Sequence, residues 1–298
     1  MKRTLFFEKP AYLSLKDGQL AVSYPDASIL RKQVPLEDVG FLVLEHSQIT
    51  LTNGLLACCE SLQVAVITCD NKHMPVGLYL GLSGHSLHNE RLRVQLGIST
   101  PLQKQLWQQT VKAKINNEAF LLSQLGIGNK KMLYWASKVQ SGDTKNHEAR
   151  AAAYFWKEVF PIQDFTRERY GQFPNNLLNY GFAILRAVCA RALVGCGLLP
   201  SIGLHHANKY NAYCLADDVM EPYRIYVVSI VCELLATSTT RDGDLLKEDK
   251  LALLKVMTLD VIIDQQNTTL LHAMTRTCVS LFECMEGKRK RILYPSYA

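Results

Sequence analysis

The segment GLHHANKYNAYCLADDVMEPYR, which runs from residue 203 to residue 224, concentrates side chains that could bind a metal ion. Its candidate ligands are His205, His206, Asp217, Asp218 and Glu221. Carboxylate oxygens together with one neutral imidazole suit Mg²⁺ or Mn²⁺ better than zinc or copper. Adjacent side chains diverge, so His205 and His206 cannot both be assumed to be ligands. The segment therefore predicts a site for a hard divalent cation, with positions left over for phosphate and water.

A single helix over residues 212–230 would determine where these carboxylates lie. Its apolar residues recur at 3.6-residue spacing, which predicts that they pack inward. Asp217, Asp218 and Glu221 then share the opposite face. A solvated helix face is the alternative interpretation, because most charged residues are exposed. Like charges at this spacing repel and add no helix stability, so a nearby cation explains the cluster better than a solvated face does.

A further carboxylate, Glu148, begins an alanine-rich helix in the segment DTKNHEARAAAYFW. A glutamate in the first turn can simply complement the helix dipole, or it can be a functional group. His147 beside it is equally ambiguous. The local sequence leaves both interpretations open.

The pattern of elements predicts an α+β protein, with a small N-terminal β domain followed by a larger all-α domain. Residues 1–80 read as short extended runs, with a hairpin turn at Asp17-Gly18 and one short helix around residues 53–61. Residues 81–90 read as a linker. Residues 91–298 are expected to form the helical domain that carries the candidate metal ligands, with helices near 101–125, 143–159, 175–194 and 211–235. The segment 236–249 is expected to be the most mobile loop.

Positive charge is concentrated beyond residue 80. Residues 1–80 carry 7 Lys and Arg against 8 Asp and Glu, so the remaining totals of 33 and 27 leave 26 against 19 for the rest of the chain. Such an excess suits contact with nucleic acid, and the aromatic rings of Tyr210 and Trp135 could stack on a displaced base. The candidate DNA contacts are Arg91, Arg93, Lys112, Lys114, Arg167, Arg169, Lys209, Arg224, Lys288, Arg289, Lys290 and Arg291.

The cysteines and the N-terminus point to a cytoplasmic protein. Nine cysteines without a CxxC pair are typical of small core residues in a reducing compartment, and a cysteine-based zinc site is not expected. The N-terminus lacks an apolar run long enough for a signal peptide. The apolar run over residues 182–199 contains Arg186 and Arg191, which argues for a buried helix rather than a membrane span.

Several segments together resemble the CRISPR-associated protein-one integrase family, in the II-C-like branch found beside RNA-guided effector nucleases. The resemblance runs over nearly the whole chain. Its most specific part is the order of three motifs, the early-helix Glu of NHEARAAAYFW, the GLHHAN segment and LADDVMEPYR. One departure follows Arg224, where relatives commonly have a proline and then an aspartate, whereas this chain has Ile225 and Val228.

The resemblance implies roles for individual residues. Glu148, His206 and Glu221 would be the catalytic residues that hold Mg²⁺ or Mn²⁺. Asp218 would support the site, and His205 and Asp217 would be uncertain supporting residues. The implied assembly is a homodimer built by the β domain, joined by a small CRISPR-associated protein-two subunit and, in some systems, the effector nuclease.

The implied reaction is the insertion of short DNA fragments into a CRISPR repeat by transesterification, in which a 3′-hydroxyl attacks a phosphodiester. Two alternatives remain open at the level of sequence. One is a structure-selective, metal-dependent nuclease for branched repair intermediates, and the other is a non-catalytic DNA-binding scaffold.

Overall fold

The computed structural model describes residues 2–26, 28–81, 84–169, 171, 173–237 and 245–297. The chain divides into two compact units, Met1–Ser86 and Leu87–Ala298. The predicted linker at 81–90 spans this division, and the first helix of the second unit begins at His88. Of the expected mobile loop at 236–249, residues 238–244 lie outside the described residues.

Over its described residues, the N-terminal unit contains two four-stranded sheets and one α-helix. One sheet has the order β1-β5-β7-β8, with β1, β5 and β7 parallel and β8 antiparallel to β7. The other sheet has the order β4-β3-β2-β6. The bounds are β1 Arg3–Phe7, β2 Ala11–Lys16, β3 Gln19–Ser23, β4 Lys32–Pro35, β5 Val39–Leu44, β6 Ile49–Leu51, α1 Asn53–Ser61, β7 Ala65–Cys69 and β8 Pro75–Tyr79.

The expected turn and the expected helix of this unit are both confirmed. Asp17 and Gly18 join β2 to β3 with φ angles of 50° and 71°, which is the left-handed backbone that a tight hairpin turn needs. The helix α1 begins after Thr52, whose side chain accepts the N–H of Leu55 at 3.4 Å.

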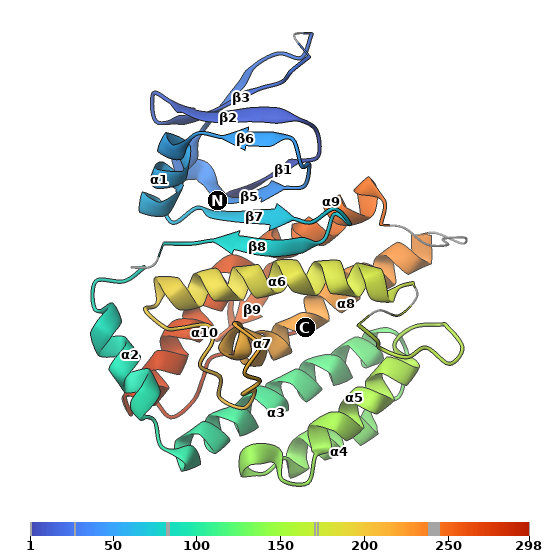
Figure 1. Ribbon diagram of the computed structural model, residues 1–298. Helices are drawn as coiled ribbons and strands as arrows, with labels where there is room; N and C mark the ends of the chain where they lie inside the picture. The colour runs from blue at the N-terminus through green and yellow to red at the C-terminus, as the bar shows by residue number, and fades with distance from the viewer. Residues whose placement is uncertain are drawn as a thin grey trace. The chain divides into compact units, whose positions relative to one another are not determined.

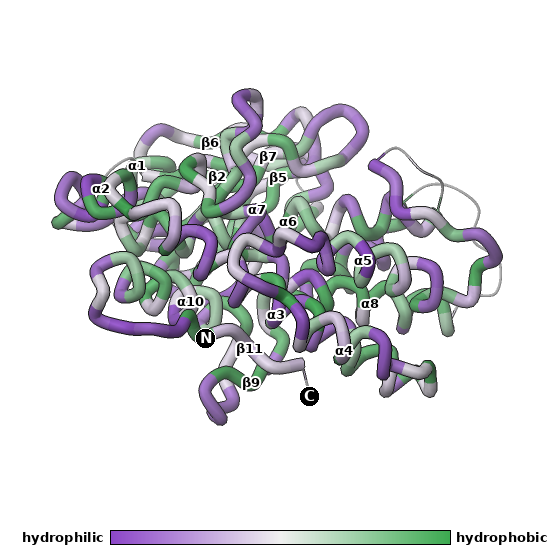
Figure 2. The backbone as a smooth tube through the Cα atoms, turned by 90° about the horizontal axis from the view of Figure 1, so that it is seen from below, coloured by the Kyte–Doolittle hydropathy of each residue, from purple (hydrophilic) through white to green (hydrophobic). Residues whose placement is uncertain are grey.

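Apolar residues from both sheets and α1 form one core in the N-terminal unit, among them Leu13, Leu20, Leu42 and Leu55. All six residues of β5 are buried, and its tube is among the most hydrophobic in Figure 2. A strand buried on both faces is expected to read as a continuous apolar run, as VGFLVL does.

The C-terminal unit is mainly helical, and α3, α4 and α5 pack side by side within it (Figure 1). The α+β class is confirmed. The bounds are α2 His88–Gly97, α3 Thr100–Gln124, α4 Lys130–Lys138, η2 Ser141–Asp143, α5 His147–Glu158, α6 Asn175–Gly195, α7 Cys214–Met220, η3 Glu221–Tyr223, α8 Arg224–Thr237, α9 Lys247–Leu254, η4 Lys255–Thr258, β9 Asp260–Ile263, β10 Gln266–Thr269, α10 Leu270–Met285 and β11 Pro295–Ser296.

The expectation of an all-helical second domain is wrong in one place, because the structure has a three-stranded sheet of order β10-β9-β11. The β-branched run Val261, Ile262 and Ile263 favours a strand. Asp264 and Gln265 then adopt φ angles of 53° and 60°, which closes a hairpin onto β10.

The expectation of one helix over residues 212–230 is also wrong. The helix α7 ends at Met220, a 3₁₀ turn follows, and α8 begins at Arg224. Pro222 lies at the start of this turn, where it cannot donate a backbone hydrogen bond and disfavours a continuous α-helix. The break places Glu221 at a helix junction instead of on a uniform helix face.

The long apolar helix α6 lies in the interior of its unit. It is the one helix among the described ranges whose length and composition would suit a membrane span, but 72% of that window is buried in the protein. Arg186 on this helix pairs with Asp217, so the arginine has a partner inside the fold.

Candidate metal and DNA site

Glu148 and Glu221 approach the same cation, the ammonium group of Lys114. Lys114 lies on α3, Glu148 in the first turn of α5, and Glu221 at the start of η3. The Lys114 Nζ donates to Glu148 Oε1 and lies 2.9 Å from Glu221 Oε2. Two of the three predicted metal ligands, distant in the sequence, thus meet at one positive charge.

The first turn of α5 is fixed by Asp143, which positions Glu148. The Asp143 carboxylate accepts the backbone N–H of His147 at 3.0 Å and of Glu148 at 2.8 Å. These are donors at a helix N-terminus that have no partner within the helix. The Glu148 carboxylate can complement the helix dipole and still bind the Lys114 ammonium, so the two interpretations of this residue are compatible. The imidazole of His147 is buried, and neither ring nitrogen has a hydrogen-bond partner among the described residues.

Glu221 is buried, with 6% of its surface exposed, and lies between two cations. Its Oε1 lies 3.0 Å from Arg224 Nη2, and its Oε2 faces Lys114. Burial raises the pKa of Glu221, but Arg224 and Lys114 lower it further, so the net pKa is below the usual value. The carboxylate is therefore ionised and available to a metal ion.

His206 is oriented by Asp218, which is completely buried. The Asp218 carboxylate accepts the backbone N–H of Leu204 at 2.6 Å and of His205 at 2.9 Å, and it lies 2.5 Å from His206 Nδ1. This hydrogen bond raises the pKa of His206 more than burial lowers it. With Nδ1 bound to Asp218, the Nε2 atom is the nitrogen of His206 that can bind a metal.

A glycine is required where this loop passes Asp218. A Cβ atom on Gly203 would lie 2.9 Å from Asp218 Oδ2 and would also collide with the carbonyl oxygen of His206. The backbone therefore approaches the carboxylate closely enough for its N–H groups to donate to it.

His205 and Asp217 have partners outside the pair of glutamates. The ring of His205 stacks on Trp107, with centroids 4.4 Å apart and an interplanar angle of 3°. Asp217 accepts from Arg186 Nε at 2.7 Å and from Asn211 Nδ2 at 2.8 Å. The expectation that Asp217, Asp218 and Glu221 share one helix face, opposite the apolar residues, is wrong, because all three are buried and each has different partners.

Sequence reasoning missed Glu118, one turn beyond Lys114 on α3. Glu118 is buried, and its Oε2 has no hydrogen-bond partner among the described residues. Burial raises the pKa of Glu118 to about 8, although Lys114 lowers it. The signal was present in the sequence, since Glu118 falls at helical spacing from the buried residues Val111, Ile115 and Leu122.

Chemically, Glu148, Glu221 and His206 fit a hard divalent cation. The two carboxylates converge on a cation, Glu221 Oε2 is buried against the Lys114 ammonium, and His206 interacts electrostatically with Glu221. Within the described part of the chain, no group of three or more His, Cys, Asp or Glu side chains is already arranged around one ion position. The Lys114 ammonium lies between the two glutamates in this arrangement.

The predicted DNA contacts fall into two groups. The first group has partners within the protein. Lys114 and Arg224 face the site glutamates, and Arg91 donates to the Cys196 carbonyl at 2.7 Å. Arg167 donates to the side-chain oxygens of Asn175 and Asn179. In the C-terminal basic segment, Lys288 pairs with Glu286 at 2.8 Å and Arg289 with Glu283 at 2.6 Å. Lys112 is partly buried, and the exposed candidates are Arg93, Arg169, Lys209, Lys288, Arg289, Lys290 and Arg291.

The two aromatic candidates also differ. Trp135 packs edge-to-face against Tyr154, with centroids 5.9 Å apart. Tyr210 is 84% exposed, and the Lys209 ammonium lies 4.9 Å from its ring centroid. Only Tyr210 has a ring face open enough for base stacking.

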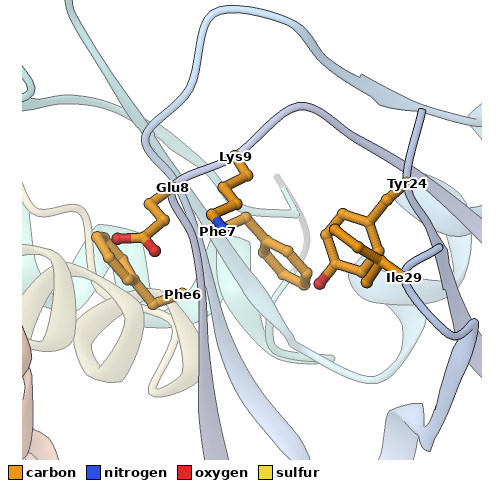
Figure 3. A pocket seen from close by; sticks show the side chains of 6 residues that line it. All are labelled: Phe6, Phe7, Glu8, Lys9, Tyr24 and Ile29. Atoms are coloured by element: carbon orange, nitrogen blue, oxygen red, sulfur yellow. The ribbon is translucent and has the colours of Figure 1, made fainter. Parts of the chain in front are cut away.

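A pocket of about 180 Å³ in the N-terminal unit contains none of the predicted site residues. Figure 3 shows the ring of Phe7 turned towards Tyr24 and Ile29, whereas Glu8 lies beside Phe6 on the other side of the strand. The predicted chemistry therefore belongs to the C-terminal unit.

Known proteins resemble this chain over most of its length. The family model described as CRISPR associated protein Cas1 matches residues 5–267. The CRISPR-associated endonuclease Cas1 of Neisseria meningitidis serogroup C (strain 8013) is 35% identical over 283 residues, covering 94% of this chain and 91% of the relative.

Solved structures share the fold. A casposase bound to integration product has a TM-score of 0.79 at 18% identity, covering 98% of this chain and 92% of that chain. A Cas6-RT-Cas1–Cas2 complex has a TM-score of 0.73 at 16% identity, covering 98% of this chain and 36% of that chain. With the family model matching most of the sequence and the Neisseria relative aligned almost from end to end, the chain belongs to the CRISPR-associated Cas1 endonuclease family.

Proposed function

We propose that this chain is a metal-dependent DNA integrase of CRISPR adaptation, which inserts short DNA fragments into a repeat array by transesterification. The observation that carries the proposal is the convergence of Glu148 and Glu221 on one cation, with His206 held by Asp218 and interacting with Glu221. The casposase neighbour supports it at the level of fold, because that protein was solved with an integration product.

Glu148, Glu221 and His206 Nε2 would hold Mg²⁺ or Mn²⁺. When bound, the ion supplies Lewis acidity to a phosphate oxygen and favours the alkoxide form of the attacking 3′-hydroxyl. The two glutamates supply negative charge, and Asp218 keeps His206 in the tautomer with a proton on Nδ1. No covalent enzyme intermediate is required for this reaction.

The remaining parts of the protein would bind DNA and partners. Exposed cations of the C-terminal unit would contact phosphates of the fragment and of the repeat, and phosphate contacts would dominate the affinity. We propose a homodimer that assembles with the small Cas2 subunit in the prokaryotic cytoplasm. The effector nuclease of the same system is a further proposed partner.

The test is joining of a short DNA duplex to a plasmid that carries the repeat array of the same genome, with the Cas2 subunit and Mg²⁺ or Mn²⁺ present. We expect joined product from the native protein and a joining activity at least about 100-fold lower for Glu221→Gln. The loss of a metal ligand should reduce activity at least as much as the loss of a residue that only orients a ligand. Glu233→Gln, an exposed glutamate on α8, is the matched control and should retain activity.

Two results would contradict the proposal in different ways. Cleavage of branched DNA without any joined product would favour the structure-selective nuclease. Unchanged joining by Glu221→Gln would remove the metal assignment.

A further inference from the structure

The position between Glu148 and Glu221 is filled by a side chain of the protein itself. The Lys114 ammonium pairs with both carboxylates, and only 8% of the Lys114 surface is exposed. Its environment includes three glutamates and one arginine, namely Glu118, Glu148, Glu221 and Arg224. A lysine in this position balances carboxylate charge that would otherwise repel inside the protein.

We propose that Lys114 is a placeholder cation, which holds Glu148 and Glu221 together in the metal-free protein and moves towards Glu118 when a divalent ion binds. This inference rests on the proposed function, since it assumes that the two glutamates are metal ligands. It makes Lys114 a positioning residue for the metal site, in contrast to the surface DNA contact predicted from the sequence.

Electrostatics requires the lysine to move. A divalent ion held by Glu148 and Glu221 would lie within a few ångströms of the ammonium if Lys114 kept its present position, and like charges at such a distance repel strongly away from bulk water. The lysine side chain has a flexible four-carbon stem and carries its charge at a single point, so it can change partner without movement of the helix.

Glu118 provides a place for the displaced ammonium. It lies four residues after Lys114 on α3, so the two side chains are neighbours on one helix face. Glu118 is 6% exposed, and its Oε2 has no hydrogen-bond partner among the described residues. A buried carboxylate oxygen without a partner is costly, and the arriving ammonium would satisfy it.

The helix that carries both residues is held in register with the metal site by Asn117. Its Nδ2 donates to the carbonyl oxygen of Pro222 at 2.9 Å and to that of Pro295 at 3.1 Å. Pro222 directly follows Glu221, so α3 and the 3₁₀ turn are tied together beside the site. Movement of the Lys114 side chain is therefore expected to be local, with α3 staying in place.

The first experiment compares Lys114→Met with the native protein in the absence of DNA. Mn²⁺ affinity is measured by isothermal titration calorimetry, and thermal unfolding is measured in metal-free buffer. We expect Lys114→Met to bind Mn²⁺ about tenfold more tightly or better, because a site that is blocked most of the time has its apparent affinity reduced by that fraction. We also expect a lower melting temperature without metal, because the glutamates lose their shared partner.

Lys104→Met is the matched control, since Lys104 is an exposed lysine on the same helix. It should change neither the Mn²⁺ affinity nor the melting temperature of the metal-free protein. Unchanged or weaker Mn²⁺ binding by Lys114→Met would overturn the placeholder role.

The native protein serves as the reference for the proposed function. If the native protein binds no Mn²⁺ and joins no DNA, the proposed function fails. If the native protein binds Mn²⁺ and joins DNA while Lys114→Met binds Mn²⁺ with the same affinity, only the placeholder role is refuted.

Glu118→Gln tests the receiving position, and it also covers the case in which Lys114→Met does not fold. We expect Glu118→Gln to weaken Mn²⁺ binding when Lys114 is present, because the ammonium has lost its alternative partner. The same change in a Lys114→Met background should have little effect, which a double-mutant cycle would show as strong non-additivity. An equal effect of Glu118→Gln in both backgrounds would contradict the receiving role, since Glu118 would then act on the metal without Lys114.

Discussion

At the scale of single residues, the site depends on carboxylates that are buried for different reasons. Asp218 is completely buried and binds the loop that carries His206, whereas Glu221 is buried between two cations. The sequence predicted carboxylate and imidazole ligands, and the resemblance assigned these roles to Glu148, His206 and Glu221. Their separate surroundings could not be predicted, because Lys114 comes from a helix distant in the sequence.

The Asp218–His206 pair predicts a pH dependence of metal binding. Protons compete with the metal for a neutral imidazole, and Asp218 raises the pKa of His206. Metal affinity is therefore expected to rise with pH until the raised pKa is passed. In Asp218→Asn the carboxylate charge is gone, so the rise should occur at lower pH. Calorimetric titration with Mn²⁺ across the pH range measures both profiles, and a midpoint that does not move would contradict the role of Asp218.

Glu118 predicts a separate effect of pH on the stability of the metal-free protein. Its pKa is raised by burial from an ordinary value of 4.5 to about 8, so between these values only the unfolded chain releases the proton. Stability from this residue should fall as pH rises through that window, by up to about 1.4 kcal/mol per pH unit, and then level off. Urea denaturation at pH 5 and pH 7 measures the free energy of unfolding of the native protein and of Glu118→Gln. If the native protein became more stable relative to Glu118→Gln as the pH rose, the prediction would be contradicted.

At the scale of elements, helix boundaries determine where the glutamates point. The predicted helix over residues 212–230 ignored the effect of Pro222, which separates α7 from α8 and places Glu221 at the junction. The hairpin of β9 and β10 was missed although its β-branched residues and turn were visible in the sequence. The long helices α3 and α6 were predicted close to their observed bounds.

The cap of α5 predicts how an element boundary affects the site. Asp143→Ala removes the acceptor for two backbone donors and should cost about 1 kcal/mol of stability, as losses of helix caps commonly do. It should also reduce strand transfer, because the first turn of α5 carries Glu148. Thr269→Ala removes the cap of α10 and is the matched control for thermal unfolding and DNA joining. Equal activity losses in the two variants would show that Asp143 has no specific effect on the site.

At the scale of the whole molecule, charge and fold were predicted more successfully than individual contacts. The positive excess lies beyond residue 80, but Arg91, Arg167, Lys288 and Arg289 have partners within the protein. Counting cations in the sequence cannot reveal these pairings, since the positions of the partner groups depend on the fold. The α+β class followed from the change of pattern after residue 80.

The exposed cations predict how DNA affinity responds to salt. Lys209→Ala should weaken DNA binding and reduce the slope of log affinity against log salt by about 1, as expected for one lost phosphate contact. Lys288→Ala should have a smaller effect, because the Lys288 ammonium already pairs with Glu286. Fluorescence anisotropy with a short duplex at several salt concentrations measures the slopes. Equal slopes for the native protein and Lys209→Ala would exclude a phosphate contact by Lys209.

The central claim is that Glu148, His206 and Glu221 hold one divalent ion. Crystals grown with Mn²⁺ and measured at a wavelength that gives its anomalous signal test this most directly. The account predicts one strong peak about 2.1 Å from a carboxylate oxygen of each glutamate and from His206 Nε2, with the Lys114 ammonium displaced from between the glutamates. A peak elsewhere, or no peak with Lys114 still bridging Glu148 and Glu221, would contradict it.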